Sequence, residues 1–304
     1  MVKISVVINT LNEEKNIERA LRSVTWADEV IIVDDGSKDS TLEAIGRVKS
    51  LESRVKVFKH KSQGYVEPAR NFAISKASGD WILILDADEE IPETLEKRLR
   101  QIPEKMHQID FVEIPRKNII FGKWMKASMW WSDYNVRFFK KGYVVWSDRI
   151  HIPPETKGKG LRLEQDEKWS IIHHHYDSVS QFIERLNRYT DIQAKELIKS
   201  GYKFKWGDLI TKPAGEFLGR FFANRGFEDG LHGLALGLLQ AFSFLVMYLR
   251  VWEMEKFQTK DMTLNELKDV KNKMGYEIDY WFKYSNLSRN PFKKYIQKIR
   301  NKFS

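Results

Sequence analysis

The feature that most constrains the fold is an apolar run that ends abruptly in acidic residues. Residues 81–85 are apolar and are followed at once by Asp86-Ala87-Asp88-Glu89-Glu90. Such a run is typical of a strand buried on both faces of a parallel sheet. In extended backbone, Asp86 and Asp88 would point the same way, and two carboxylates suit a divalent cation that also holds a diphosphate.

The same acids have a structural interpretation. Pro92 can open a helix, and acidic side chains are favoured in a first helical turn. Glu89 and Glu90 are expected to have this role, which leaves Asp88 as the more direct metal ligand and Asp86 as its neighbour.

Strand and helix patterns alternate over the first part of the chain. Strands are expected over residues 3–9, 29–33, 55–58 and 81–85. Asn12 is expected to cap the first helix, and Pro68 to open another that runs to Ala77. This order predicts an α/β fold with a mainly parallel sheet and flanking helices, whose ligands bind beyond the carboxyl ends of the strands. Asn9-Thr10, Asp34-Asp35 and Asp86-Ala87-Asp88 all follow such strands.

Composition narrows the function classes. The 304 residues include no cysteine, which excludes disulfides, thiolate zinc sites and cysteine nucleophiles. The net charge of +9 favours an anionic partner, either nucleic acid, anionic lipid or a phosphorylated substrate. The absence of cysteine is compatible with a reducing cytosolic compartment. The amino terminus runs straight into a strand pattern, with no signal-peptide layout expected.

The carboxyl-terminal third differs in character. Residues 217–225 form a basic amphipathic pattern, and residues 234–249 are almost wholly apolar. Sixteen helical residues span about 24 Å, less than the roughly 30 Å hydrocarbon core, so an interfacial or re-entrant helix is expected. Gly233, Gly237 and Ala241 would let another helix approach closely. The alternative is a buried core helix of a soluble protein.

The tail repeats the basic amphipathic theme. Apolar residues recur at helical spacing over residues 292–303 among lysines and arginines. This pattern predicts an anchor on anionic lipid, and an ordinary solvated helix is the alternative. The predicted organisation is therefore 1–115 and 116–200 as two halves of one domain, 201–255 as membrane-associating helices and 256–304 as a basic tail.

Several ordered blocks carry a family resemblance. They are residues 5–14, 33–41, 69–71, 79–81 and 85–89, with looser similarity through Arg137-Phe138-Phe139, Ile150-His151 and residues 173–178. Together they resemble the family-2 nucleotide-sugar glycosyltransferases of GT-A fold, in the branch with lipopolysaccharide-core glucosyltransferases. The resemblance implies an inverting, metal-dependent sugar transfer to a lipid-linked or cell-envelope acceptor at the inner face of the cytoplasmic membrane.

The resemblance also implies roles for individual residues. Mg²⁺ or Mn²⁺ would be bound by Asp88, with Asp86 and His173 beside it, since carboxylate and phosphate oxygens are hard ligands. The remaining donor contacts are implied for the following residues: Asn9, Thr10, Asn12, Glu13, Asp34, Asp35, Arg70, Asp86 and Ala87. As a structural alternative, Asp34-Asp35-Gly36-Ser37 would make a tight turn and helix cap, and Arg70 would be a solvated helix residue.

The base that takes the acceptor proton is the weakest assignment. Many members of the branch that this chain resembles carry a His-Glu pair, whereas this chain has Ile152 at the glutamate position after His151. Glu155 is the favoured base, with Asp148 and His151 as rivals. A surface-loop glutamate is the structural alternative for Glu155. His173-His174-His175 lacks the ligand spacing of a structural zinc site, and a partly buried structural histidine is the alternative for His173.

Two other functions are weighed against this hypothesis. A nucleotidyl-transfer enzyme on the same fold usually has a glycine-rich first turn, but residues 9–14 contain no glycine. A non-enzymatic nucleic-acid-binding protein is suggested by the net charge, but many of its cations lie in the lipid-like tail. No nucleic-acid partner is therefore expected, and the chain alone names neither the donor sugar nor the acceptor.

Overall fold

The computed structural model describes residues 2–61, 66–147, 152–259 and 261–285. The chain forms two compact units. Unit 1 comprises Met1–Ile120 and Trp131–His175, and unit 2 comprises Phe121–Trp130 and Tyr176–Ser304. The boundaries expected from the sequence at residues 115, 200 and 255 stay predictions.

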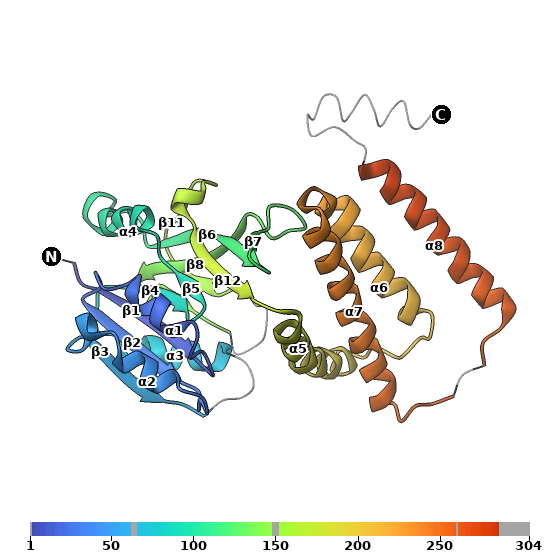
Figure 1. The fold of residues 1–304 in the computed structure, drawn as a ribbon, viewed down its shortest axis with the longest axis horizontal. Coiled ribbons are helices and arrows are strands. Elements are labelled where there is room, and N and C mark those ends of the chain that lie inside the picture. The colour runs from blue at the N-terminus through green and yellow to red at the C-terminus, as the bar shows by residue number, and fades with distance from the viewer. Residues whose placement is uncertain (1, 62–65, 148–151, 260, 286–304) are drawn as a thin grey trace. The chain divides into compact units, whose positions relative to one another are not determined.

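Unit 1 is built around a mixed sheet (Figure 1). Its strand order is β3-β2-β1-β4-β8-β6-β12-β5, with β11 beside β6. The first four strands are parallel, and β8 joins β4 antiparallel. The strands are β1 (Ile4–Thr10), β2 (Glu29–Asp34), β3 (Val55–Lys59), β4 (Trp81–Asp86), β5 (Glu89–Glu90), β6 (Phe111–Ile120), β8 (Asp133–Lys140), β11 (Gly160–Arg162) and β12 (Ile171–Tyr176).

Alternate residues of the central strands point to opposite faces of the sheet and pack into two apolar cores. Val6 and Leu83 pack on one side with α1 (Ile17–Arg22), α2 (Thr41–Gly46) and α4 (Glu93–Lys105). Val7 and Ile84 pack on the other with α3 (Glu67–Lys76). Burial on both faces explains why these strands are continuous apolar runs.

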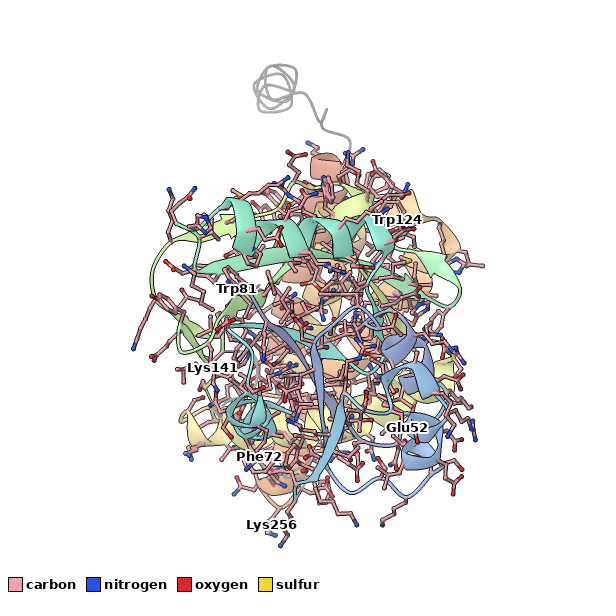
Figure 2. All side chains as sticks on the ribbon, turned by 90° about the vertical axis from the view of Figure 1, so that its left-hand side faces the viewer. Glu52, Phe72, Trp81, Trp124, Lys141 and Lys256 are labelled. Carbon is pink, nitrogen blue, oxygen red and sulfur yellow. The ribbon has the colours of Figure 1, made fainter. Side chains whose placement is uncertain are left out.

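Aromatic packing joins the parallel and antiparallel halves of the sheet. The rings of Trp81, labelled in Figure 2, and Phe138 have centroids 4.6 Å apart. Short segments complete unit 1: the two-stranded sheet of β9 (Val144–Val145) and β10 (Glu155–Thr156), and the 3₁₀ turns η1 (Lys49–Leu51) and η2 (Glu167–Trp169). The α/β fold predicted from the sequence is confirmed.

Unit 2 is helical apart from the short strand β7 (Lys123–Trp124). Its elements are α5 (Val179–Lys199), α6 (Asp208–Leu218), the π-helical turn η3 (Gly219–Ala223), η4 (Gly226–Asp229), α7 (Leu231–Met254) and α8 (Leu264–Ser285). Helices α6 and α7 lie side by side (Figure 1). A Cβ atom on Gly233 would come 1.8 Å from the carbonyl oxygen of Gly226, and one on Gly237 would lie 3.3 Å from Phe217. The small-residue stripe therefore packs against this unit's own chain.

Two local predictions are wrong. Asn12 does not cap α1, because it adopts a left-handed conformation with φ 56° and the helix begins a turn later, after Asn16. Helix α7 has 24 residues rather than sixteen, so its length is about 36 Å. By length and composition α7 could cross a membrane, and the argument that it is too short does not hold.

Candidate active site

The carboxyl ends of β1, β2 and β4 bring the predicted nucleotide-binding residues to one edge of the sheet. Thr10 is in register with Asp34, and Asn9 is in register with Asp86. Asn9 is 7% exposed, yet neither its amide nitrogen nor its amide oxygen has a hydrogen-bond partner among the described residues. The buried Thr10 hydroxyl also has none. Buried polar atoms are seldom left this way, so this edge is chemically fitted to receive a polar ligand.

The two aspartates at the carboxyl end of β2 have different surroundings. Asp34 accepts hydrogen bonds from the backbone N–H groups of Gly36 and Ser37, which makes the turn expected as the structural alternative. Asp35 pairs with His60 Nδ1 at 2.8 Å. Burial raises the pKa of Asp35, and the neighbouring Asp34 carboxylate adds to this, while His60 opposes it. Asp35 is therefore more readily protonated than an ordinary aspartate.

Asn12 and Glu13 hold the first loop against the second. Asn12 Oδ1 accepts from the Lys38 backbone N–H at 2.8 Å, and the Glu13 backbone N–H donates to Thr41 Oγ1 at 2.8 Å. The Glu13 carboxylate also accepts from the Asn16 amide. These contacts shape the rim of the site, and direct nucleotide binding by the two residues stays a prediction.

Asp86 ends β4 between two arginines. Its carboxylate accepts from Arg70 at 2.9 Å and from Arg137 at 2.6 Å. Burial raises the pKa of Asp86, but the Arg137 and Arg70 guanidinium groups outweigh it and hold the pKa well below its usual range. Arg70 itself is buried, and its Nη1 has no partner among the described residues. Arg70 thus has a donor left for an anionic ligand and is not a solvated helix residue.

Glu89 corrects a prediction. It lies in β5, is fully buried, and pairs with Arg137 at 2.8 Å and Arg116 at 3.4 Å. Its carboxylate also accepts the backbone N–H of Asp86 at 2.9 Å. Helix α4 begins only at Glu93. The prediction that Glu89 and Glu90 are first-turn acids is therefore wrong. Both residues form β5, Ile91 and Pro92 separate them from α4, and their carboxylates pair with side chains inside the sheet.

Asp88 and His173 face each other. Ala87 and Asp88 form a turn instead of continuing the strand, so Asp86 and Asp88 have different neighbours. His173 Nε2 lies 3.6 Å from Asp88 Oδ1, and both side chains are buried. His173 Nδ1 lies 2.6 Å from Asn118 Oδ1. The predicted structural alternative, a partly buried histidine, and the predicted ligand role are both compatible with this geometry.

The donor set fits a hard divalent cation shared with a ligand. Among the described residues, no cluster of three or more His, Cys, Asp or Glu side chains could hold a metal. One carboxylate leaves coordination positions for phosphate oxygens and water, as in sites that hold Mg²⁺ by one or two carboxylates and substrate phosphates. The His173 imidazole would add one nitrogen donor beside it.

Of the predicted base residues, Glu155 lies within the part of the chain that the structure describes. Asp148 and His151 lie outside the described residues. Glu155 is exposed in β10, where it pairs with Val145 of β9. Trp146, which follows Val145, makes two backbone hydrogen bonds with the Asn71 side chain of α3. Asn71 follows Arg70 in the chain. The role of Glu155 as base stays a prediction.

Sequence reasoning missed the polar side chains that support the site. They are Arg116 and Asn118 on β6, Asp133 and Arg137 on β8, and Glu89 on β5. One signal was present: Arg137 stands in an apolar β-run beside Phe138 and Phe139. A fully charged residue in such a run needs a buried partner. Its partners, however, lie 48 and 51 residues away in the chain, which no local pattern reveals.

Comparisons with known proteins identify the family to which this chain is similar. The model of the family described as "Glycosyl transferase family 2" matches residues 5–162. An uncharacterized glycosyltransferase of Rickettsia typhi is 30% identical over 291 residues, covering 90% of this chain and 96% of the relative. LpsC, a lipopolysaccharide core biosynthesis glycosyltransferase of Rhizobium meliloti, is 25% identical over 234 residues, covering 76% and 84%.

A solved structure is also similar. The crystal structure of residues 1–349 of Staphylococcus aureus TarS superposes with a TM-score of 0.44 at 18% identity, covering 82% of this chain and 91% of that one. The family match extends over more than half of the chain and includes every strand-end residue described above. This chain therefore belongs to glycosyl transferase family 2 and is a glycosyltransferase.

Proposed function

We propose that the chain is an inverting, metal-dependent glycosyltransferase that moves a sugar from a nucleoside-diphosphate donor to a cell-envelope glycan or lipid-linked acceptor. The observation that carries the proposal is a set of buried polar atoms of Asn9, Thr10 and Arg70, beside Asp86, that have no hydrogen-bond partner among the described residues. A nucleotide satisfies such groups, whereas an empty apolar pocket would not need them. The envelope acceptor is supported by the likeness to LpsC.

The chemistry joins one bond change to one proton transfer. The acceptor oxygen attacks the anomeric carbon, the bond from that carbon to the diphosphate breaks, and a base takes the acceptor proton. Glu155 is the proposed base, with Asp148 and His151 as rivals. Asn9, Thr10, Asp34 and Asp35 hold the nucleoside, with Asn12, Glu13 and Ala87 at the rim. Asp86 stays ionised because Arg70 and Arg137 flank it, and orients the ribose.

The diphosphate end is held by charge. Arg70 Nη1 donates to a phosphate oxygen, while Arg70 Nη2 stays on Asp86. Asp88 and His173, next to Asp86, would hold Mg²⁺ or Mn²⁺. The cation supplies positive charge to the leaving diphosphate, which gains charge in the transition state.

The decisive test is Asp88→Asn. Because the change keeps side-chain volume, we expect an unchanged melting temperature with loss of nearly all sugar transfer. Transfer is followed as nucleotide release from a panel of UDP-, GDP- and ADP-sugars, which also identifies the donor. Full activity of Asp88→Asn, or activity unaffected by EDTA, contradicts the mechanism.

We further propose that the enzyme contacts the inner face of the cytoplasmic membrane through unit 2. Helix α7 exposes Leu231, Leu238, Phe242 and Leu249, which are 77, 54, 45 and 37% exposed and spaced seven, four and seven residues apart on one face. An exposed apolar helix face of this kind is unusual for a soluble monomer. Flotation with anionic liposomes tests this contact, and protein that stays wholly in the soluble fraction contradicts it.

A further inference from the structure

A row of polar side chains crosses four neighbouring strands behind the proposed metal site. Asp133 lies on β8, Asn118 on β6, His173 on β12 and Asp88 in the turn before β5, which is also the order of these strands in the sheet. The Asn118 amide nitrogen lies 3.5 Å from Asp133 Oδ2, and its amide oxygen lies 2.6 Å from His173 Nδ1. Asn118 is fully buried and His173 is 5% exposed.

The direction of each hydrogen bond follows from which groups carry protons. Asp133 pairs with Arg116, whose Nε donates to it at 2.9 Å. Burial raises the pKa of Asp133, but the Arg116 guanidinium outweighs this, so the pKa is lowered and the carboxylate can only accept. The Asn118 NH₂ group must therefore face Asp133, and its carbonyl oxygen must face the histidine.

The orientation of Asn118 then decides the tautomer of His173. A carbonyl oxygen accepts, so the Nδ1 that faces it must carry a hydrogen. In the neutral ring Nε2 then carries the lone pair. Nε2 points toward Asp88 Oδ1 across 3.6 Å, beyond the usual hydrogen-bond distance. A lone pair and a carboxylate that face each other at this separation are arranged to share a cation.

We propose that Asn118, oriented by Asp133, is a positioning residue that fixes His173 as the Nδ1–H tautomer and presents the Nε2 lone pair beside Asp88. This inference rests on the proposed function, because the cation shared by Asp88 and His173 is the one proposed there. It adds two residues that touch neither donor nor metal. Partners of this kind set the orientation and basicity of a ligating histidine.

A purely structural role for Asn118 makes a different prediction. A hydrogen bond that Asp133 does not orient could form with either histidine tautomer, since the Asn118 amide could then present its NH₂ to an unprotonated Nδ1. Only the positioning role requires a hydrogen on Nδ1 and a lone pair on Nε2. The tautomer is therefore a readout that a structural role leaves undetermined.

The first experiment measures that tautomer directly. Long-range ¹H–¹⁵N correlation spectra of the metal-free, histidine-labelled full chain distinguish the two neutral forms, and loss of a resonance in His173→Gln assigns it. At alkaline pH we expect protonated Nδ1 and unprotonated Nε2 in the wild type. The opposite tautomer overturns the proposal, and this result needs no variant of Asn118 to fold.

The second experiment measures Mn²⁺ alone, through the loss of its free EPR signal. Asn118→Leu keeps most of the volume but removes the acceptor, so we expect about 10- to 100-fold weaker Mn²⁺ binding. Asn135→Leu is the matched control, because Asn135 also donates to Asp133, at 3.1 Å, and among the described residues its side chain makes no hydrogen bond with His173. The control should bind Mn²⁺ like the wild type.

The variants separate failure of this inference from failure of the proposed function. If Asp88→Ala and His173→Ala bind Mn²⁺ as tightly as the wild type, the metal site itself is wrong. If those two lose Mn²⁺ while Asn118→Leu keeps wild-type affinity, the metal site stands and the positioning role of Asn118 is overturned.

Discussion

The two halves of the sheet treat their polar side chains in opposite ways. At the carboxyl edge of the parallel half, Asn9 and Thr10 keep buried polar atoms without partners among the described residues. In the antiparallel half, the side chains of Arg137, Glu89 and Arg116 form ion pairs with one another and with aspartates, and Arg137 Nε is the one atom of these three side chains that is buried without a partner among the described residues. The difference indicates two separate roles. The unpaired groups are free to bind a ligand, and the paired groups keep the site in shape when no ligand is bound.

The largest expected effect comes from breaking the paired half. Arg137→Met should lower the free energy of unfolding by about 3–5 kcal/mol, because it leaves the fully buried Glu89 without its nearest cation. Urea unfolding measures the change. As a control, Arg22→Met removes an exposed ion pair to Glu18 and should change stability by only about 0.5 kcal/mol. Equal effects of the two variants would mean that burial of the network is irrelevant.

A smaller effect is expected at the opposite edge of the parallel half. Burial raises the pKa of Glu29, but bonds from Lys56, Ser78 and Ser5 outweigh it and lower the pKa to about 2 from an ordinary 4.5. A lowered folded-state pKa contributes stability that is complete above about pH 4.5 and is lost as the pH falls toward about 2. Glu29→Gln should therefore lower the free energy of unfolding by about 2 kcal/mol at neutral pH. It should also make that free energy depend less on pH below about pH 4.5.

Thermal unfolding between pH 2 and 7 measures this difference, with circular dichroism as the signal. If the loss of stability at low pH were the same in Glu29→Gln and the wild type, other carboxylates would dominate acid unfolding. Glu29 would then not stabilise the amino end of the sheet.

The smallest effect on stability should come from the unpaired site. Asn9→Leu removes two buried polar atoms that lack described partners, so the free energy of unfolding should change by less than about 1 kcal/mol or rise. Nucleoside diphosphate binding, measured by calorimetry, should nevertheless fall at least tenfold. Asn71→Leu is the matched control, because Asn71 makes two hydrogen bonds with the Trp146 backbone.

Asn71→Leu should lower stability by about 1–3 kcal/mol, since it leaves backbone groups of Trp146 unpaired. If Asn9→Leu were the more destabilising of the two, Asn9 would contribute to folding. The contrast between the unpaired side chains of the ligand site and the paired side chains that support it would then be wrong.

The same contrast explains how much the sequence could predict. Asp34, Asp35 and Asp86 follow apolar strands directly, and strand order alone brings them to one edge of the sheet. The role of Glu89 was mistaken because the rule for acids near a helix start competes with burial, and only the fold shows that Arg137 reaches it. Asn118 meets His173 across 55 residues of chain, so no spacing in the sequence indicates the pair.

The loop between β6 and β8 has a consequence for synthesis of the protein. Phe121–Trp130 belongs to the helical unit, where the Asp229 carboxylate accepts the backbone N–H groups of Lys126 and Ala127. Asp229 follows Ala127 by 102 residues, so at typical translation rates of about 5–20 residues per second the loop waits roughly 5–20 s for its anchor. The strands on both sides of the loop are made first, and a ribosome that stops before Asp229 leaves that loop unanchored.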